Sequence, residues 1–367
     1  MAPKNIKFVE LTSKYRPLGS QYHRDLDRVL SSGSFVLGSE VARLEESVKH
    51  FTNGNYAIGV GNGTDALILS IKAMDIGSGD EVITSPMSYL ASASSIAQCG
   101  ATAVFVDVDN SLNLDPKMIE QAITEKTKAV LVVHMAGIPA SMGNIMEIAN
   151  RHHLSVIEDC AQAFGAKYDG RSVGTFGRFG TFSFHPLKTP GTIGDGGLIL
   201  VEDKKDAEWL LQARNHGHNG RDECDFWSIN SRLDEIHAAF LNSHMEFQPN
   251  QLKRRRKFAD IYRKELANVV GFPQISESGL PSYNWIMILA KRRQELIDHL
   301  IDNGIESKIH YPKLIPDLKA ADTSCRTNGS LQNARSKVKY ILSLPSAEHI
   351  TEDSLFFICE QIKKFYS

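Results

Sequence analysis

The pattern of hydrophobic positions changes at about two thirds of the chain. Between residues 56 and 203, short apolar runs rich in β-branched residues alternate with stretches whose apolar residues recur at helical spacing. Several runs are apolar almost without alternation, which is typical of strands covered on both faces. We therefore predict an α/β fold with a mostly parallel seven-stranded sheet between helices. The predicted strands are Tyr56–Val60, Glu81–Thr84, Thr102–Asp107, Lys128–Val133, Ser155–Glu158, Gly180–Phe184 and Leu198–Val201.

Beyond residue 250 the pattern changes. A long charged helical pattern begins at Gln251 and ends near Asn268, and a stretch rich in Gly, Pro and Ser follows it. A second, smaller αβ unit comes next, with a strand at Trp285–Leu289 and helices at Arg292–Asn303 and Glu352–Phe365. We predict a large domain over residues 1–250, N-terminal segment included, and a small C-terminal domain over 251–367.

Composition narrows the class of protein. Hydrophobic residues make up 42% and charged residues 23% of the 367 residues, which is ordinary for a soluble globular protein. A net charge of -2 gives no reason to expect nucleic acid or an acidic membrane surface as partner. The five cysteines are scattered, and neither a signal-peptide pattern nor a membrane-spanning run is present. We expect a cytoplasmic enzyme or binding protein.

The candidate nucleophile is Lys188. It lies shortly after the predicted strand that ends at Phe184, and it precedes the glycine-rich run Gly191–Gly197. Ligands of such sheets bind beyond the carboxyl ends of strands, so this lysine can point into a cleft. Partial desolvation beside a cationic ring lowers the pKa of a lysine and makes its amine a usable nucleophile and base. Taken alone, a lysine in this position would usually be interpreted as a surface residue in a glycine-rich loop.

Two polar residues follow another predicted strand. Asp159 comes directly after Ser155–Glu158, and Gln162 lies three positions further on. A carboxylate here can pair with a pyridinium nitrogen and keep it protonated, and Gln162 can hydrogen-bond the ring's 3-oxygen. Asp159 is also suited to cap a following helix. Its spacing of 29 residues from Lys188, one strand later, favours the cofactor role.

Further candidates lie near other strand ends. Gly63 and Thr64 stand where a glycine turn enters an apolar helix, and the free N–H groups of a helix start suit a phosphate. Thr64 is equally suited to cap that helix. Ser183 is a second phosphate candidate, because strand alternation can aim it at the same cleft. Tyr89 can stack on a ring or belong to the core, and its position favours neither.

Two other patterns predict no site. His216 and His218 have no third ligand nearby, so we interpret them as loop residues and predict no metal site. The basic run Lys253–Lys257 resembles a nucleic-acid patch, but it lies within a helical pattern. We interpret it as a solvated helix face.

Together these motifs resemble the sugar aminotransferases of the DegT/DnrJ/EryC1/StrS family, within the aspartate aminotransferase fold type (fold type I of enzymes that use pyridoxal 5'-phosphate). The resemblance covers nearly the whole chain. Single motifs are modest evidence, but their joint order and spacing are hard to obtain by chance. The motifs are Ser32–Gly38, Gly61–Leu67, Glu158–Ala163, Ser183–Lys188, Gly194–Gly197, Asn230–Ile236 and Leu342–Pro345.

The resemblance implies pyridoxal 5'-phosphate as cofactor and a role for each candidate residue. Lys188 would form the internal aldimine, Asp159 would pair with the pyridine nitrogen and Gln162 with the 3-oxygen. The other implied cofactor contacts are Tyr89 on the ring and Gly63, Thr64 and Ser183 at the phosphate. Asn230 would reach the phosphate of the neighbouring subunit, so a homodimer with shared active sites is expected. The implied substrate contacts are His185, Lys308, His310 and Tyr311.

The resemblance also implies L-glutamate as amino donor and a nucleotide-linked keto-sugar as acceptor. The forms Gly194–Gly197 and Ile309–Pro312 are closer to members that aminate C3 of a dTDP-linked keto-sugar. His185 and His237 stand where many members have an aromatic residue and a glutamine. Two alternatives are a sugar dehydratase on the same fold and a regulatory protein that binds the cofactor without catalysis. The combination of Lys188, Asp159 and Gln162 favours the aminotransferase.

Overall fold

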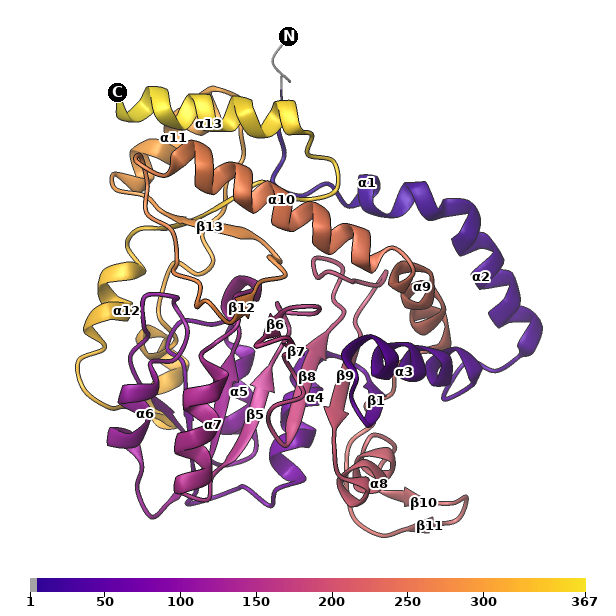
Figure 1. The fold of residues 1–367 in the computed structure, drawn as a ribbon. Helices are drawn as coiled ribbons and strands as arrows, with labels where there is room; N and C mark the ends of the chain where they lie inside the picture. Colours follow the sequence, from indigo (N-terminus) through magenta and orange to yellow (C-terminus); the bar gives the residue numbers. More distant parts are fainter. Residues whose placement is uncertain (1–4) are drawn as a thin grey trace.

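The computed structural model describes residues 5–367 and is built around one eight-stranded sheet (Figure 1). The strands follow the order β1-β9-β8-β5-β4-β2-β3-β14. Strand β9 is antiparallel to both β1 and β8, and all other neighbours are parallel. The strands are β1 Tyr56–Val60, β2 Glu81–Thr84, β3 Thr102–Phe105, β4 Thr127–Val133, β5 Ser155–Asp159, β8 Phe179–Ser183, β9 Gly197–Val201 and β14 Cys325–Thr327.

All seven predicted strands belong to this sheet, but the predicted number of strands is too small by one. The additional strand, β14, is only three residues long and carries Arg326 at its centre, so it gives no apolar run. Arg326 is stable there because its guanidinium binds both carboxylate oxygens of Glu81, at 2.8 and 2.7 Å. Residues beyond 250 therefore contribute to the large sheet. The domain division at residue 250 stays a prediction.

Strand β4 shows why the central strands are apolar on both faces. Its residues Ala129, Leu131 and Val133 pack in a core with helices α4 (Gly63–Lys72) and α5 (Ala91–Gln98). The intervening Val130 and Val132 pack on the opposite face, with helices α6 (Pro116–Ala122) and α7 (Met142–Arg151). Successive strand side chains point to opposite faces, so helices on both sides require an unbroken apolar run.

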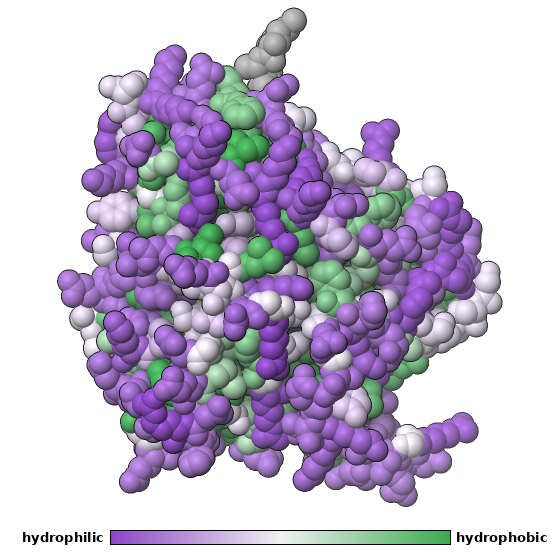
Figure 2. Space-filling model, in the orientation of Figure 1, coloured by the Kyte–Doolittle hydropathy of each residue, from purple (hydrophilic) through white to green (hydrophobic). Residues whose placement is uncertain are grey.

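A separate core lies beside the two-stranded antiparallel sheet of β13 (Ile286–Leu289) and β15 (Ile341–Leu344). Helices α10 (Gln248–Leu266), α11 (Arg293–Asp302) and α13 (Glu352–Tyr366) pack there. In Figure 1, α10 runs from α9 (Glu235–Met245) toward this unit, and α13 lies beside it. Figure 2 shows the molecule in the orientation of Figure 1. Hydrophilic residues cover most of the face that is visible there, and apolar residues appear on it in small groups.

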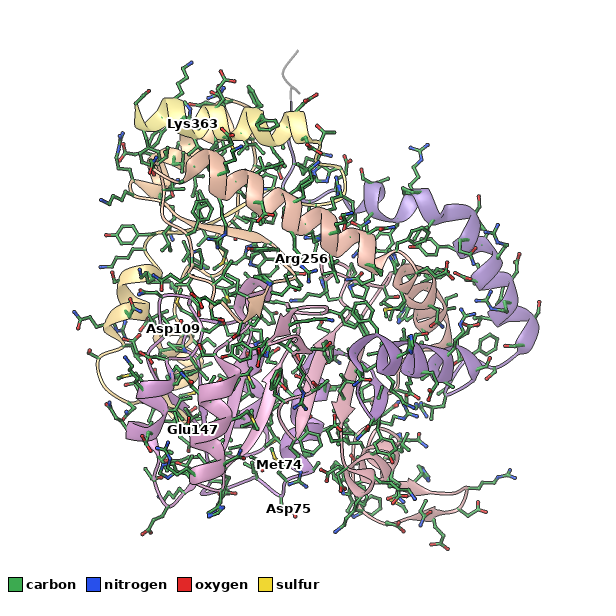
Figure 3. All side chains as sticks on the ribbon, viewed as in Figure 1. Met74, Asp75, Asp109, Glu147, Arg256 and Lys363 are labelled. Carbon is green, nitrogen blue, oxygen red and sulfur yellow. The ribbon has the colours of Figure 1, made fainter. Side chains whose placement is uncertain are left out.

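The interpretation of Lys253–Lys257 on α10 as a solvated helix face was wrong for its three arginines, although the two lysines are exposed. Arg256, labelled in Figure 3, donates to the carbonyls of Pro281 (2.8 Å) and Gly165 (3.0 Å). Arg255 is buried, and Arg254 binds carbonyls that follow β15. These guanidinium groups satisfy loop carbonyls that have no strand partner, which is why charged residues occupy this helix.

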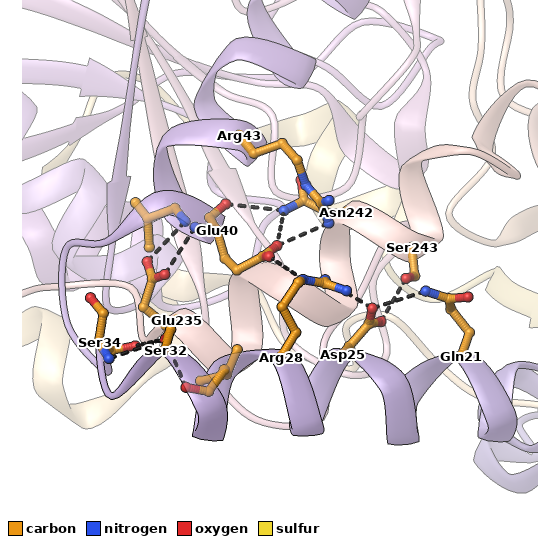
Figure 4. Close-up of polar contacts among 12 residues, drawn as sticks. Gln21, Asp25, Arg28, Ser32, Ser34, Glu40, Arg43, Glu235, Asn242 and Ser243 are labelled. Carbon is orange, nitrogen blue, oxygen red and sulfur yellow. Dashed lines mark hydrogen bonds and ion pairs between the residues drawn. The ribbon is translucent and has the colours of Figure 1, made fainter.

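Polar contacts attach helix α2 (Gly19–Ser32) to helices α3 (Ser39–Thr52) and α9 (Figure 4). Glu235 accepts three backbone N–H groups at the start of α3, at 2.9 to 3.0 Å. The buried Glu40 pairs with Arg28 (2.6 Å) and accepts from Asn242 (3.0 Å). A buried carboxylate needs such partners, so these contacts fix α2 on the large unit. None of the helices in residues 5–367 has both the length and the apolarity needed to cross a bilayer.

Candidate active site

A cavity of about 460 Å³ lies where β1, β2, β5 and β8 end, at one edge of the sheet. These four strands run in the same direction, so residues that follow them meet there. Residues of the C-terminal unit close the other side. The predicted site residues that line this cavity are Gly63, Thr64, Tyr89, Asp159, Gln162, Ser183, His185, Lys188, His310 and Tyr311.

Lys188 is half-buried on the turn that follows β8. Its amine lies 5.5 Å from the centre of the Trp285 ring. Burial lowers the pKa of this amine from 10.5 to about 8, and the negative charge of Asp159 opposes that shift. The turn is held from the N-terminal helix α1 (Leu11–Tyr15), because Lys14 Nζ donates to the carbonyls of Pro186 (2.9 Å) and Lys188 (2.6 Å). Lys188 is therefore a fixed, partly neutral amine and not a surface residue.

Asp159 is buried at the end of β5 and its partners are neutral. Its Oδ2 accepts from Ser92 Oγ (2.7 Å) and its Oδ1 accepts from the N–H of Ala161 (3.1 Å). The segment between Asp159 and the next strand, β6 (Lys167–Tyr168), contains no helix. The contact with Ala161 therefore closes a local turn and does not cap a helix. Within residues 5–367, Asp159 forms no ion pair. A buried carboxylate is stable when it faces a cation, and a protonated ring nitrogen bound in the cavity would meet that need.

The carboxylate beside Asp159 has a structural role. Glu158 accepts backbone N–H groups from Gly174 (2.8 Å), Phe176 (2.7 Å) and Gly177 (2.9 Å), and it also contacts His134 Nε2 at 3.0 Å. His134 accepts the N–H of Ala140 with its other nitrogen. These two buried side chains and Cys160 could be mistaken for metal ligands. Their polar atoms hold loops in place, and we interpret the group as a scaffold behind Asp159.

Gln162 is oriented by the protein. Its side-chain oxygen accepts the N–H of Ala136 at 2.7 Å, and its amide nitrogen lies 3.4 Å from the hydroxyl of Tyr311. The oxygen is therefore engaged, and the NH₂ group remains as a donor on the cavity wall. A donor in this position fits an anionic ring oxygen.

The start of helix α4 fits a phosphate. Asn62 caps the helix by accepting the N–H of Asp65 (2.9 Å), so the predicted cap at Thr64 was wrong by two residues. Within residues 5–367, the N–H groups of Gly63 and Thr64 have no protein acceptor. A Cβ on Gly63 would lie 2.7 Å from the Cβ of Ser183, so glycine is needed for the close approach of this turn to β8. Two free N–H groups and a serine thus converge where the helix dipole is positive.

Tyr89 is not a core residue, because 51% of its surface is exposed. Its ring centre lies 5.8 Å from that of Tyr311, at an angle of 47°. The ring therefore forms part of the cavity wall and is free to stack on a ligand. That stacking role stays a prediction.

Two predicted site residues do not line the cavity. Asn230 is exposed, and its backbone pairs with Asn215. Lys308 is exposed, and its backbone pairs with Ser343. The proposed contact of Asn230 with a neighbouring subunit and the substrate role of Lys308 remain predictions.

Sequence reasoning missed the role of Trp285. Its ring stacks on His310, with centres 4.1 Å apart and planes at 14°, and it faces the amine of Lys188. His310 binds Ser343 Oγ (3.0 Å), and burial, with the nearby charges of Lys188 and Lys308, lowers its pKa to about 4. His310 is therefore neutral at pH 7. An aromatic residue at the start of a predicted strand was the available signal for Trp285.

Comparison with known proteins gives matches along almost the whole chain. The sequence model of the DegT/DnrJ/EryC1/StrS aminotransferase family matches residues 18–363. A pleiotropic regulatory protein of Geobacillus stearothermophilus is 37% identical, with 99% of each chain covered. A dTDP-3-amino-3,4,6-trideoxy-alpha-D-glucose transaminase of Streptomyces venezuelae is 34% identical, covering 98% of this chain and 96% of the relative. A UDP-N-acetyl-3-dehydro-alpha-D-glucosamine 3-aminotransferase of Acidithiobacillus ferrooxidans is 34% identical. The match covers 98% of this chain and 97% of the relative.

Solved structures agree with the fold over the same extent. DesV of S. venezuelae, in complex with a ketimine intermediate, has a TM-score of 0.96 at 34% identity and covers 100% of this chain and 99% of that one. NtdA of Bacillus subtilis, with the cofactor PMP bound, has a TM-score of 0.92 at 25% identity. The match covers 99% of this chain and 86% of that one. The predicted fold class is confirmed by these likenesses.

Proposed function

The chain belongs to the DegT/DnrJ/EryC1/StrS aminotransferase family, and from this premise we propose that it moves an amino group from L-glutamate to a nucleotide-linked keto-sugar with pyridoxal 5'-phosphate. One observation carries the proposal. Lys188, the buried Asp159 and the first N–H groups of α4 lie around a single cavity, and residues 5–367 offer neither an ion-pair partner to Asp159 nor an acceptor to those N–H groups. This set matches the three parts of the cofactor that a transaminase must hold: the carbonyl carbon, the ring nitrogen and the phosphate.

The chain's own residues supply binding and proton transfer. Asp159 would hold the ring nitrogen protonated, Gln162 would donate to the 3-oxygen, and Gly63, Thr64 and Ser183 would hold the phosphate. When bound, the cofactor supplies an electron sink for a carbanion at the α-carbon of the donor. Lys188 Nζ, with its pKa near 8, keeps a fraction of neutral amine at pH 7 and can remove the proton from that α-carbon.

We further propose a dTDP-linked acceptor and amination at C3. The S. venezuelae relative is named for a dTDP-linked 3-amino sugar, and the A. ferrooxidans relative is also named as a 3-aminotransferase, although its substrate carries UDP. His185, His310, Tyr311 and Lys308 are the proposed substrate contacts. Asn230, exposed and away from its own cavity, is proposed to reach the phosphate site of a partner chain in a homodimer.

The test is an absorbance spectrum of the purified holoenzyme before and after L-glutamate is added. The proposal predicts a visible cofactor band that shifts to shorter wavelength with L-glutamate and returns when the keto-sugar acceptor is added. Lys188→Ala should bind the cofactor without the lysine-linked band. Screening dTDP- and UDP-linked keto-sugars then identifies the acceptor. A wild-type band that no amino acid shifts would contradict the proposal.

A regulatory role is the second candidate, because the Geobacillus relative carries a regulatory name. A role without catalysis does not need an amine of lowered pKa facing a buried carboxylate. If Lys188→Ala preserves the biological role in cells, the regulatory function is favoured. Release of water or ammonia without net amine transfer would instead favour a dehydratase.

A further inference from the structure

The N-terminal strap, residues 6–15, joins the C-terminal unit to the turn that carries Lys188. Its first residues are bonded to the C-terminal unit. The N–H of Ile6 donates to the carbonyl of Gly304 (2.7 Å), and the carbonyl of Ile6 accepts the N–H of Glu306 (2.9 Å). The last five residues of the strap form helix α1. A helix this short is not stable alone, so its place depends on contacts at both ends of the strap.

Three carbonyl groups of the Lys188 turn receive their hydrogen bonds from α1. Lys14 Nζ donates to the carbonyls of Pro186 (2.9 Å) and Lys188 (2.6 Å). The hydroxyl of Tyr15 donates to the carbonyl of Thr192 (2.7 Å) and, at 3.3 Å, to that of Pro186. Within residues 5–367, these three carbonyls have no other donor. Carbonyl groups that are shielded from water need a donor, so two side chains of the strap fix the backbone of the turn.

The turn is shaped to admit the ammonium group of Lys14. A Cβ on Gly191 would lie 2.8 Å from Lys14 Nζ, 2.6 Å from the carbonyl oxygen of His185 and 2.8 Å from that of Lys188. Glycine is therefore needed at this position for the close approach of Lys14 to the backbone. Within residues 5–367, no carboxylate lies at ion-pair distance from Lys14, so its main partners are the two carbonyls of the turn.

The chemistry of the Lys188 amine depends on where the turn places it. Burial lowers the pKa of this amine to about 8, and the charge of Asp159 opposes that shift. The imidazole groups near the amine, His185 and His310, are mostly neutral at pH 7 because burial lowers their pKa values. Since burial causes the shift of Lys188, a movement of its backbone toward water would reverse it.

We propose that Lys14 is a positioning residue for Lys188. Its ammonium group holds the carbonyls of Pro186 and Lys188, and this hold keeps the Lys188 amine inside the cavity. Without Lys14 the carbonyl of Lys188 has no protein donor, so the turn moves outward to reach water. The amine is then better solvated, more fully protonated near neutral pH and a poorer nucleophile. The need for a nucleophile rests on the proposed function, whereas the placement of the amine does not.

The test follows the methylation of Lys188 by formaldehyde and cyanoborohydride in the full-length, cofactor-free protein. Mass spectrometry of the peptide that contains Lys188 gives the rate from about pH 6 to 11, a range that brackets the pKa values of lysines. The rate rises with the neutral fraction of the amine. We expect the midpoint of this rise near pH 8 in the wild type. In Lys14→Met the midpoint should rise by about one unit or more, which lowers the neutral fraction at pH 7 about tenfold.

Lys7→Met is the matched control. Lys7 lies on the same strap, but it is exposed and its ammonium group pairs with Glu10, so the variant should keep the wild-type midpoint. Lys14→Gln serves if Lys14→Met does not fold. Its neutral side chain is shorter and reaches at most one of the two carbonyls, so it should raise the midpoint by a smaller amount.

Two results would overturn the proposal. If the folded Lys14 variants keep the wild-type midpoint, whatever their thermal stability, Lys14 supports the fold and does not position Lys188. If Lys7→Met raises the midpoint as much as Lys14→Met does, a general loosening of the strap explains the effect. The methylation needs neither the cofactor nor an amino donor, so failure of the proposed transamination would leave this test intact.

Discussion

Ser92 donates a hydrogen bond of 2.7 Å to the carboxylate of Asp159, from a helix that lies 67 residues earlier in the chain. Ser88 lies 2.8 Å from Ser92 Oγ, so two hydroxyl groups connect the cavity wall to the carboxylate. These donors are neutral. They orient Asp159 without compensating its charge, and they leave that charge for a cation in the cavity.

Replacing Ser92 should therefore weaken the hold on the cofactor. We expect Ser92→Ala to raise the dissociation constant of pyridoxal 5'-phosphate by about tenfold, because one hydrogen bond to a carboxylate contributes on the order of 1.5 kcal/mol. Equilibrium titration of the cofactor-free protein with pyridoxal 5'-phosphate measures this dissociation constant. Ser94→Ala, on the same helix but with its hydroxyl on the carbonyl of Ala91, is the control and should bind as the wild type does. Equal affinities in the two variants would show that Ser92 does not orient the carboxylate.

The lowered pKa of Lys188 predicts how the cofactor-free protein responds to pH. The unfolded chain binds more protons than the folded one between about pH 8 and 10.5. Burial of the charged amine therefore destabilises the folded state fully below pH 8, and this effect disappears as pH rises toward 10.5. Lys188→Met should be more stable than the wild type at pH 7 by about 1–3 kcal/mol, with a difference that shrinks above pH 8.

Urea unfolding of both cofactor-free proteins at pH 7 and pH 10 checks this expectation. Lys319→Met, at an exposed position, is the matched control and should change stability little at either pH. If Lys188→Met has no advantage at pH 7, the amine is better solvated than its surroundings indicate.

Glu348 gives the opposite pH dependence. Its pKa is about 2 in the folded protein and near 4.5 when unfolded, so its stabilisation is complete above about pH 4.5 and is lost as pH falls toward 2. Glu348→Gln should lower the free energy of unfolding by about 2–3 kcal/mol at pH 7, and by less at pH 3. The more exposed pair of Glu352 with Lys257 provides the control, since Glu352→Gln should change stability by less than about 1 kcal/mol. Similar losses in both variants at pH 7 would contradict the role of Glu348.

The strands and the two central site residues could be predicted because their signals are local. Buried parallel strands are continuous apolar runs, and a polar residue directly after such a run lies at the ligand edge of the sheet. Asp159 satisfies that rule, and Lys188 lies on the turn that follows β8 at the same edge. Helix α4 begins at Gly63, because Asn62, and not Thr64, caps it.

The missed features depend on contacts between distant segments. Strand β14 exists because Arg326 meets Glu81, which lies 245 residues earlier. Ser92 and Trp285 gain their roles only when helix α5 and strand β13 are brought to the cavity. The arginines of α10 look solvated in a helical pattern, and only the folded loops show which carbonyls they bind. No periodicity in the sequence reports such pairings.

The shared site of the proposed homodimer can be tested by mixing two defective variants. Each site would use Lys188 from one chain and Asn230 from the other. Lys188→Ala removes the amine, and Asn230→Asp places a negative charge against the phosphate. In a mixed dimer one site carries both changes and the other is intact. Co-refolding equal amounts should yield half mixed dimers, and so about a quarter of the wild-type activity. Mixing without unfolding, so that chains do not exchange, is the control. If Asn230 serves its own chain, no intact site forms, and the co-refolded mixture shows only the mean activity of the two variants.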